Sequence, residues 1–79
     1  MATLMQKDVL IEMAAYARSI IAHRTEPNTE LNDDQVELVK MRNFIYSTSP
    51  DKLDFDKLVS EINYIKDKYI SLPVNKFYL

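Results

Sequence analysis

The chain has 79 residues, a net charge of −2 and neither cysteine nor glycine. A chain of this length forms one domain, and without cysteine it has no disulfides and no zinc–thiolate site. The phosphate-binding loops of nucleotide-binding folds are also excluded, because they need glycine where the backbone approaches the phosphate. The nearly balanced charge argues against a strongly basic nucleic-acid binder.

The first predicted helix covers residues 4–25. Thr3 and Gln6 have the spacing of a capping box at its start. Pro27 disfavours helical backbone at the residue before it, so the helix is expected to stop there. Apolar residues recur on one face at the spacing of an amphipathic helix. This expected core face consists of Leu10, Met13, Ala17, Ile20 and Ile21.

The second predicted helix covers residues 33–47. Asn32 and Gln35 again have the spacing of a capping box, and acidic residues in the first turn suit the helix dipole. Apolar residues cover a wide arc of this helix, so we expect it to contact the third helix and a second surface. Its main apolar row is Leu38, Met41 and Ile45.

The third predicted helix ends at residue 72, because Pro73 disfavours helix at the residue before it. It begins at residue 51 if Ser49 and Pro50 start it, or at residue 54 if Asp54 caps it separately. Its apolar residues form the most regular pattern in the chain, so we expect the other helices to be organised around it. This apolar seam is shorter than those that long coiled coils usually sustain, although it could still pair two chains. The seam consists of Phe55, Leu58, Ile62, Ile65, Tyr69 and Leu72.

These patterns predict an all-α fold, a small three-helix bundle with up-down-up topology. The whole chain, residues 1–79, is expected to form one domain with an apolar C-terminal tail at residues 73–79. Two interpretations of the tail stay open. It either lies as a strap over its own bundle or anchors a partner or a second copy.

Several residues are candidates for binding a partner. Arg42 lies within the apolar arc of the second helix, where a charge must find a carboxylate, reach water or face a partner. Tyr46 lies one helical turn later, and Tyr64 points away from the seam. Tyrosine and arginine are enriched at binding hot spots. With the end of the tail, the candidates are Arg42, Tyr46, Tyr64, Phe77, Tyr78 and Leu79.

The sequence predicts no catalytic residue, no metal site and no cofactor. His23 is the only histidine, and nothing in the sequence identifies a carboxylate to orient it as a general base. The acidic residues between 26 and 37 lack the spacing of an EF-hand. Asp54 and Asp56 are explained by a helix N-terminus, which favours acids. We therefore expect the protein not to be an enzyme.

The expected function is protein binding, by a small adaptor, inhibitor or accessory subunit that occludes or bridges a partner. A self-associating homodimer is the alternative, and a nucleic-acid-associated regulator is a further one. The latter is disfavoured because the third helix carries more acids than bases, whereas groove-reading helices are normally basic. No stretch reaches about eighteen uncharged apolar residues, so no membrane span is expected. The start does not resemble a secretory signal, so we expect a cytoplasmic location. Lysine outnumbers arginine, and Ile, Asn and Tyr are common, as in many bacterial and phage proteins.

Overall fold

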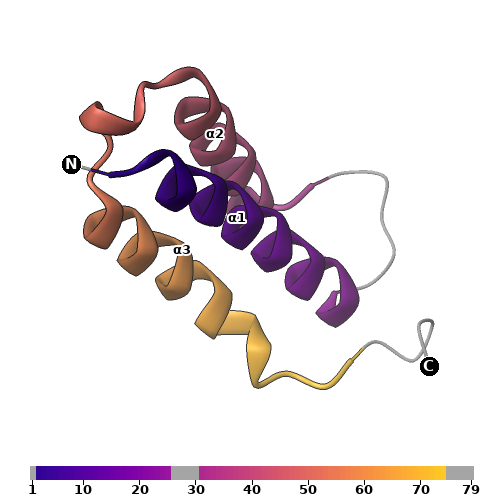
Figure 1. Ribbon diagram of the computed structural model, residues 1–79. Helices are drawn as coiled ribbons and strands as arrows, with labels where there is room; N and C mark the ends of the chain where they lie inside the picture. The colour runs from indigo at the N-terminus through magenta and orange to yellow at the C-terminus, as the bar shows by residue number, and fades with distance from the viewer. Residues whose placement is uncertain (1, 26–30, 75–79) are drawn as a thin grey trace.

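The computed structural model describes residues 2–25 and 31–74. Within these ranges the chain forms α1 (Leu4–Arg24), α2 (Asp33–Ser47), the short 3-10 helix η1 (Pro50–Lys52) and α3 (Phe55–Ile70). The helices alternate in direction, and α1 lies between the other two (Figure 1). The predicted all-α three-helix bundle is confirmed.

Both predicted capping boxes are present. The backbone N–H of Gln6 donates to Thr3 Oγ1 at 3.1 Å, and the N–H of Thr3 donates to Gln6 Oε1 at 3.0 Å. At the start of α2, the N–H of Gln35 donates to Asn32 Oδ1 at 2.8 Å, and the N–H of Asn32 donates to Gln35 Oε1 at 3.0 Å. Each box satisfies backbone donors that a helix start leaves without intrahelical partners.

The two predicted starts of the third helix correspond to two separate elements. Pro50 begins η1, and Asp54 caps α3 by accepting a hydrogen bond from the N–H of Lys57 at 3.1 Å. Between them, Leu53 is 1% exposed and belongs to the core. α3 ends at Ile70, two residues earlier than predicted, so Leu72 lies beyond the helix and is 44% exposed.

The core is centred on α1, so the prediction that the third helix organises the fold is wrong. α1 packs against both α2 and α3, whereas α2 and α3 make almost no close backbone approach to each other. The predicted contact of the second helix with the third is made by the side chain of Asp34 with Lys68 and Tyr69, and the second surface that it contacts is α1. Ala14 and Ala17 of α1 are fully buried, and short side chains let neighbouring helices come close. The buried residues are Leu10, Ala14, Ala17, Ile20, Ile21, Leu38, Met41, Ile45, Leu53, Leu58, Ile62 and Ile65.

The start of the chain is tied to the connection between α2 and α3. Lys7 Nζ donates to the carbonyl oxygen of Thr48 at 2.8 Å, and the N–H of Ala2 donates to the carbonyl oxygen of Pro50 at 3.1 Å. These bonds hold the connection against the first turn of α1. The ends of α2 and α3 that meet there are therefore fixed relative to the core.

Candidate protein-binding groove

A continuous groove runs between α2 and α3. It consists of two hollows of about 440 and 610 Å³ that share Glu37, Met41 and Glu61 in their linings. The hollows lie between the two helices that pack on α1 but not closely on each other. We call this feature the α2–α3 groove.

The α2–α3 groove has apolar surface along its length. Met41, Leu58 and Ile65 belong to the core, yet each keeps 7% of its surface exposed, and each lines the groove. Two aromatic side chains stand beside them, Phe44 from α2 and Tyr64 from α3. They are 53% and 71% exposed, so much of their surface is available to a ligand.

Acidic and basic residues are distributed unevenly along the groove. Glu37 and Glu61 line both hollows and thus mark the centre of the groove. Lys40, Lys52 and Lys57 line only the hollow that contains Phe44. The Lys57–Glu61 contact is an exposed pair at 4.0 Å, which stabilises little. Among the described residues, no ion pair involves Glu37, Lys40 or Lys52.

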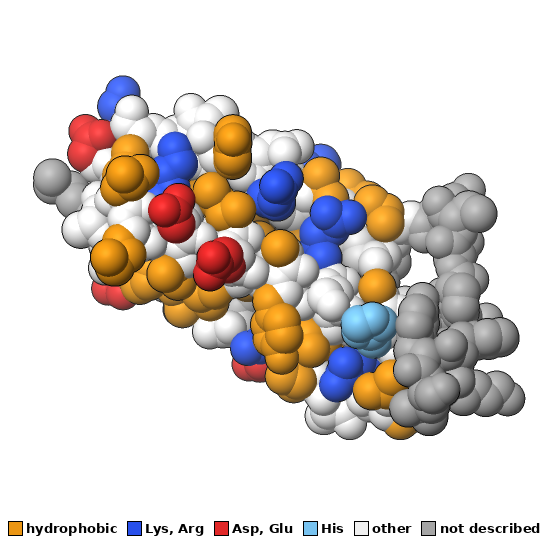
Figure 2. Space-filling view, turned by 45° about the vertical axis from the view of Figure 1, so that its right-hand side comes forward, with side chains coloured by type: hydrophobic (Ala, Val, Ile, Leu, Met, Phe, Trp, Pro, Cys, Tyr) orange, Lys and Arg blue, Asp and Glu red, His pale blue; other side chains and the backbone are white. Residues whose placement is uncertain are grey.

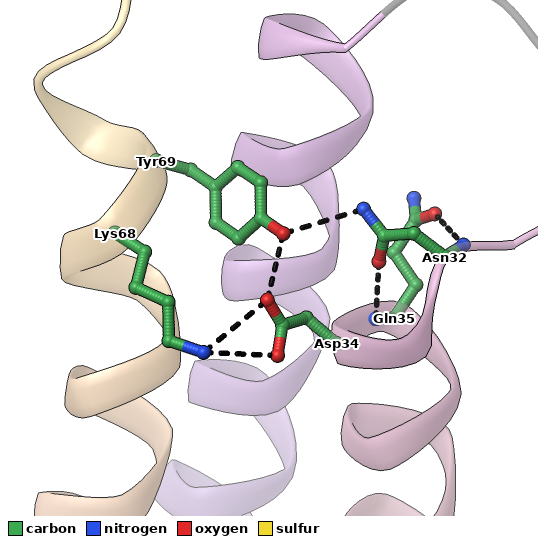
Figure 3. Close-up of polar contacts among 5 residues, drawn as sticks. All are labelled: Asn32, Asp34, Gln35, Lys68 and Tyr69. Atoms are coloured by element: carbon green, nitrogen blue, oxygen red, sulfur yellow. Dashed lines mark hydrogen bonds and ion pairs between the residues drawn. The ribbon is translucent and has the colours of Figure 1, made fainter.

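A polar cluster joins α2 to α3 at the other end of the groove (Figure 3). The Tyr69 hydroxyl donates to Asp34 Oδ2 at 2.7 Å and accepts from Asn32 Nδ2 at 3.4 Å. Lys68 Nζ donates to the two carboxylate oxygens of Asp34 at 3.2 and 3.4 Å. The same Lys68 nitrogen lies 5.1 Å from the centre of the Tyr64 ring, within cation–π range.

This cluster shifts the pKa of two of its members. The hydrogen bond from Tyr69 lowers the pKa of Asp34, and Lys68 acts in the same direction, while burial opposes them. Burial raises the pKa of Tyr69 to about 12, and the hydrogen bond to Asp34 adds to this effect. At neutral pH the cluster therefore holds an ionised carboxylate and a neutral phenol, which is the arrangement its hydrogen bonds require.

The structure separates the predicted contact residues. Tyr64 lines the α2–α3 groove. Arg42 and Tyr46 each lie two residues from Phe44, so they point about 200° around α2 from that groove residue. Tyr46 is 67% exposed, and no ion pair or hydrogen bond of Arg42 is found among the described residues. Residues 77–79, the predicted contacts Phe77, Tyr78 and Leu79, lie outside the described ranges.

Sequence reasoning missed most of the groove. Phe44 stands next to the apolar row of its helix, and that position was the one signal that it is not fully buried. Glu37, Lys40 and Glu61 had no such signal, because each resembles an ordinary solvent-facing charge. Their placement depends on the distance between α2 and α3, which neither helix encodes alone.

Other kinds of site are not found in the described part of the chain. Residues 2–25 and 31–74 contain no group of three or more His, Cys, Asp or Glu side chains that could hold a metal ion. None of the helices in these ranges has the length and apolar character needed to cross a membrane. Comparisons with protein-family models, curated proteins and solved structures found no match.

Proposed function

We propose that the protein is a small interaction module that binds a segment of a partner protein in the α2–α3 groove. One observation carries this proposal: a groove with an apolar floor is flanked by Phe44 and Tyr64, which are largely exposed. Covering an apolar or aromatic side chain stabilises a complex by about 1–3 kcal/mol. A partner that covers both aromatic side chains would gain this stabilisation from each of them.

The proposed action is binding without catalysis, as an adaptor, inhibitor or accessory subunit. The module would occlude or bridge its partner through the groove. The proposed binding site differs from the contact site expected from the sequence in one respect. Tyr64 remains a proposed contact, whereas Arg42 and Tyr46 face a different side of α2 and serve as the comparison. The cytoplasmic location expected from the sequence stays a prediction.

The test compares three baits made from the full chain. The wild type, the double variant Phe44→Ala/Tyr64→Ala and the control Tyr46→Ala are used in affinity capture from cells of the source organism. The control removes an aromatic side chain from outside the groove, and its exposure of 67% lies between those of Phe44 and Tyr64. We expect proteins that the wild type and the control retain and the double variant loses. Circular dichroism checks that all three baits are folded, and equal retention by the double variant would reject the groove as the binding site.

A second candidate, self-association, is supported by an exposed apolar stripe on α1. Met5, Val9 and Tyr16 share one face of this helix and are 76%, 39% and 56% exposed. On the side of the molecule seen in Figure 2, however, exposed hydrophobic side chains are interspersed with charged ones. Obligate dimer interfaces are more continuously hydrophobic. Sedimentation equilibrium tests this candidate, since a monomer at every concentration excludes it.

A further inference from the structure

We infer that the α2–α3 groove receives an amphipathic α-helix of the partner, which completes a four-helix bundle. This inference rests on the proposed function and names the class of ligand. α2 and α3 both pack on α1 but scarcely approach each other. In a four-helix bundle, two helices that share a neighbour without packing on each other occupy diagonal positions. The groove then lies where the fourth helix would be.

A helix fits the groove better than an extended segment. α2 and α3 satisfy their backbone groups internally, so they offer no strand edge to which an extended peptide could bond. A helical ligand needs no such edge, because its backbone hydrogen bonds are its own. From Asp34 to Phe44 the lining covers about three turns of α2, or about 15 Å. A ligand helix of about three turns matches this length.

The charges in the groove define the ligand further. Glu37 and Glu61 lie at its centre, where a ligand Lys or Arg would be attracted. Lys40, Lys52 and Lys57 lie at the Phe44 end and outnumber Asp54, the one carboxylate that lines this hollow alone, so acidic ligand residues would be attracted there. We therefore expect an apolar helix face with a basic residue near its middle and acidic residues at one end. Such complementarity favours the correct partner and its orientation.

Two occupants from the chain itself fit less well. The exposed face of α1 carries Asp8 and Glu12, so docking a second copy by this face would bring carboxylates against Glu37 and Glu61. Like charges in contact are unfavourable at an interface. As a helix, residues 73–79 would span only about 10 Å, which is shorter than the groove, and as an extended segment they would find no strand edge there. A helix of another protein is the occupant that meets both the charge and the length requirements.

The experiment is a selection from a displayed library of helical peptides of about four turns. Apolar residues are fixed along one face, and the positions between them are randomised. The baits are the full-length wild type, the groove variant Glu37→Lys/Glu61→Lys and the control Asp8→Lys/Glu12→Lys. The control makes the same change in charge on exposed positions of α1.

We expect the wild type and the control to enrich Lys or Arg near the middle of the peptide, and the groove variant to enrich Asp or Glu there. A peptide selected on the wild type should bind the groove variant at least about tenfold more weakly. Enrichment of the same charge at the middle of the peptides selected with all three baits would overturn the inference. So would a gain of about tenfold in affinity when the chain is truncated after Leu72, because the tail would then be the occupant.

The failure of the proposed function would look different. In that case Phe44→Ala/Tyr64→Ala would bind the selected peptides as well as the wild type, or no peptide would be enriched. If these aromatics matter but the central charge does not, the inference fails while the proposed function, binding of a partner in the groove, stands. The two results therefore separate the inference from the function on which it rests.

Discussion

The hydroxyl of Tyr69 on α3 donates a 2.7 Å hydrogen bond to the carboxylate of Asp34 on α2. With the Lys68 contacts to the same carboxylate, it joins two helices that otherwise meet mainly through α1. All of these bonds lie at one end of the α2–α3 groove. The other end is held by the short connection through η1.

Removing the Tyr69 hydroxyl should weaken the fold modestly. Tyr69→Phe leaves the ring but deletes the donor to Asp34, and a hydrogen bond of this kind contributes about 1 kcal/mol. Urea unfolding followed by circular dichroism should show this loss in the free energy of unfolding. Tyr16→Phe is the matched control, because the Tyr16 side chain is 56% exposed on α1. Equal stability of both variants would mean that the polar cluster does not stabilise the fold.

The contribution of Asp34 should depend on pH in the acidic range. Its pKa is lowered in the folded state, so its contribution is fully present above the ordinary value of 3.8 and is lost as the pH falls through the lowered one. The wild type should therefore be more stable than Asp34→Asn at neutral pH, and this difference should shrink below about pH 4. Unfolding curves collected over a pH series check this. A difference independent of pH would show that the carboxylate charge is not involved.

The centre of α1 should reject a larger side chain. Ala17 is fully buried, so Ala17→Leu should lower the free energy of unfolding by about 1–3 kcal/mol through overpacking. Ala15 lies on the exposed side of the same helix, and Ala15→Leu should change stability by less than about 0.5 kcal/mol. Thermal and urea unfolding of the two variants make the comparison. Similar effects at both positions would contradict the central place of α1.

Leu53 should contribute as much to the stability of the fold as a buried leucine within a helix. It is 1% exposed although it lies between η1 and α3, so Leu53→Ala should cost about 2–5 kcal/mol. Leu72→Ala is the control, because Leu72 is 44% exposed beyond α3. Chemical unfolding measures both. A loss at Leu72 as large as that at Leu53 would mean that the residues directly after α3 contribute as much to the core.

The parts of the fold that could be predicted are those with local signals. Thr3 with Gln6 and Asn32 with Gln35 form capping boxes, because the bonds join residues three apart in the sequence. The regular apolar spacing likewise identified the buried side of α3. Leu53 was not singled out as core, because a single residue between two elements shows no periodicity.

The arrangement of the helices could not be read in the same way. An apolar pattern tells which side of a helix is buried, but it does not tell which other helix covers it. This is why α3, with the most regular seam, was expected at the centre, and α1, with fully buried alanines, was not. Tyr64 could be predicted as exposed because it lies off the seam. Its position across a groove from Glu37 depends on the spacing of two helices and is not local information.

The central position of α1 also determines how the molecule can open. α2 and α3 each pack on α1 and are joined to each other mainly by the Asp34 cluster and by η1, so once that cluster opens either outer helix can leave α1 before the other. The buried amides of α1 become fully accessible only when both have left, and they should exchange with solvent most slowly. A ligand helix bound across α2 and α3 would couple these two openings. It would add a further link between α2 and α3 along the groove, so that the core opens as a single unit.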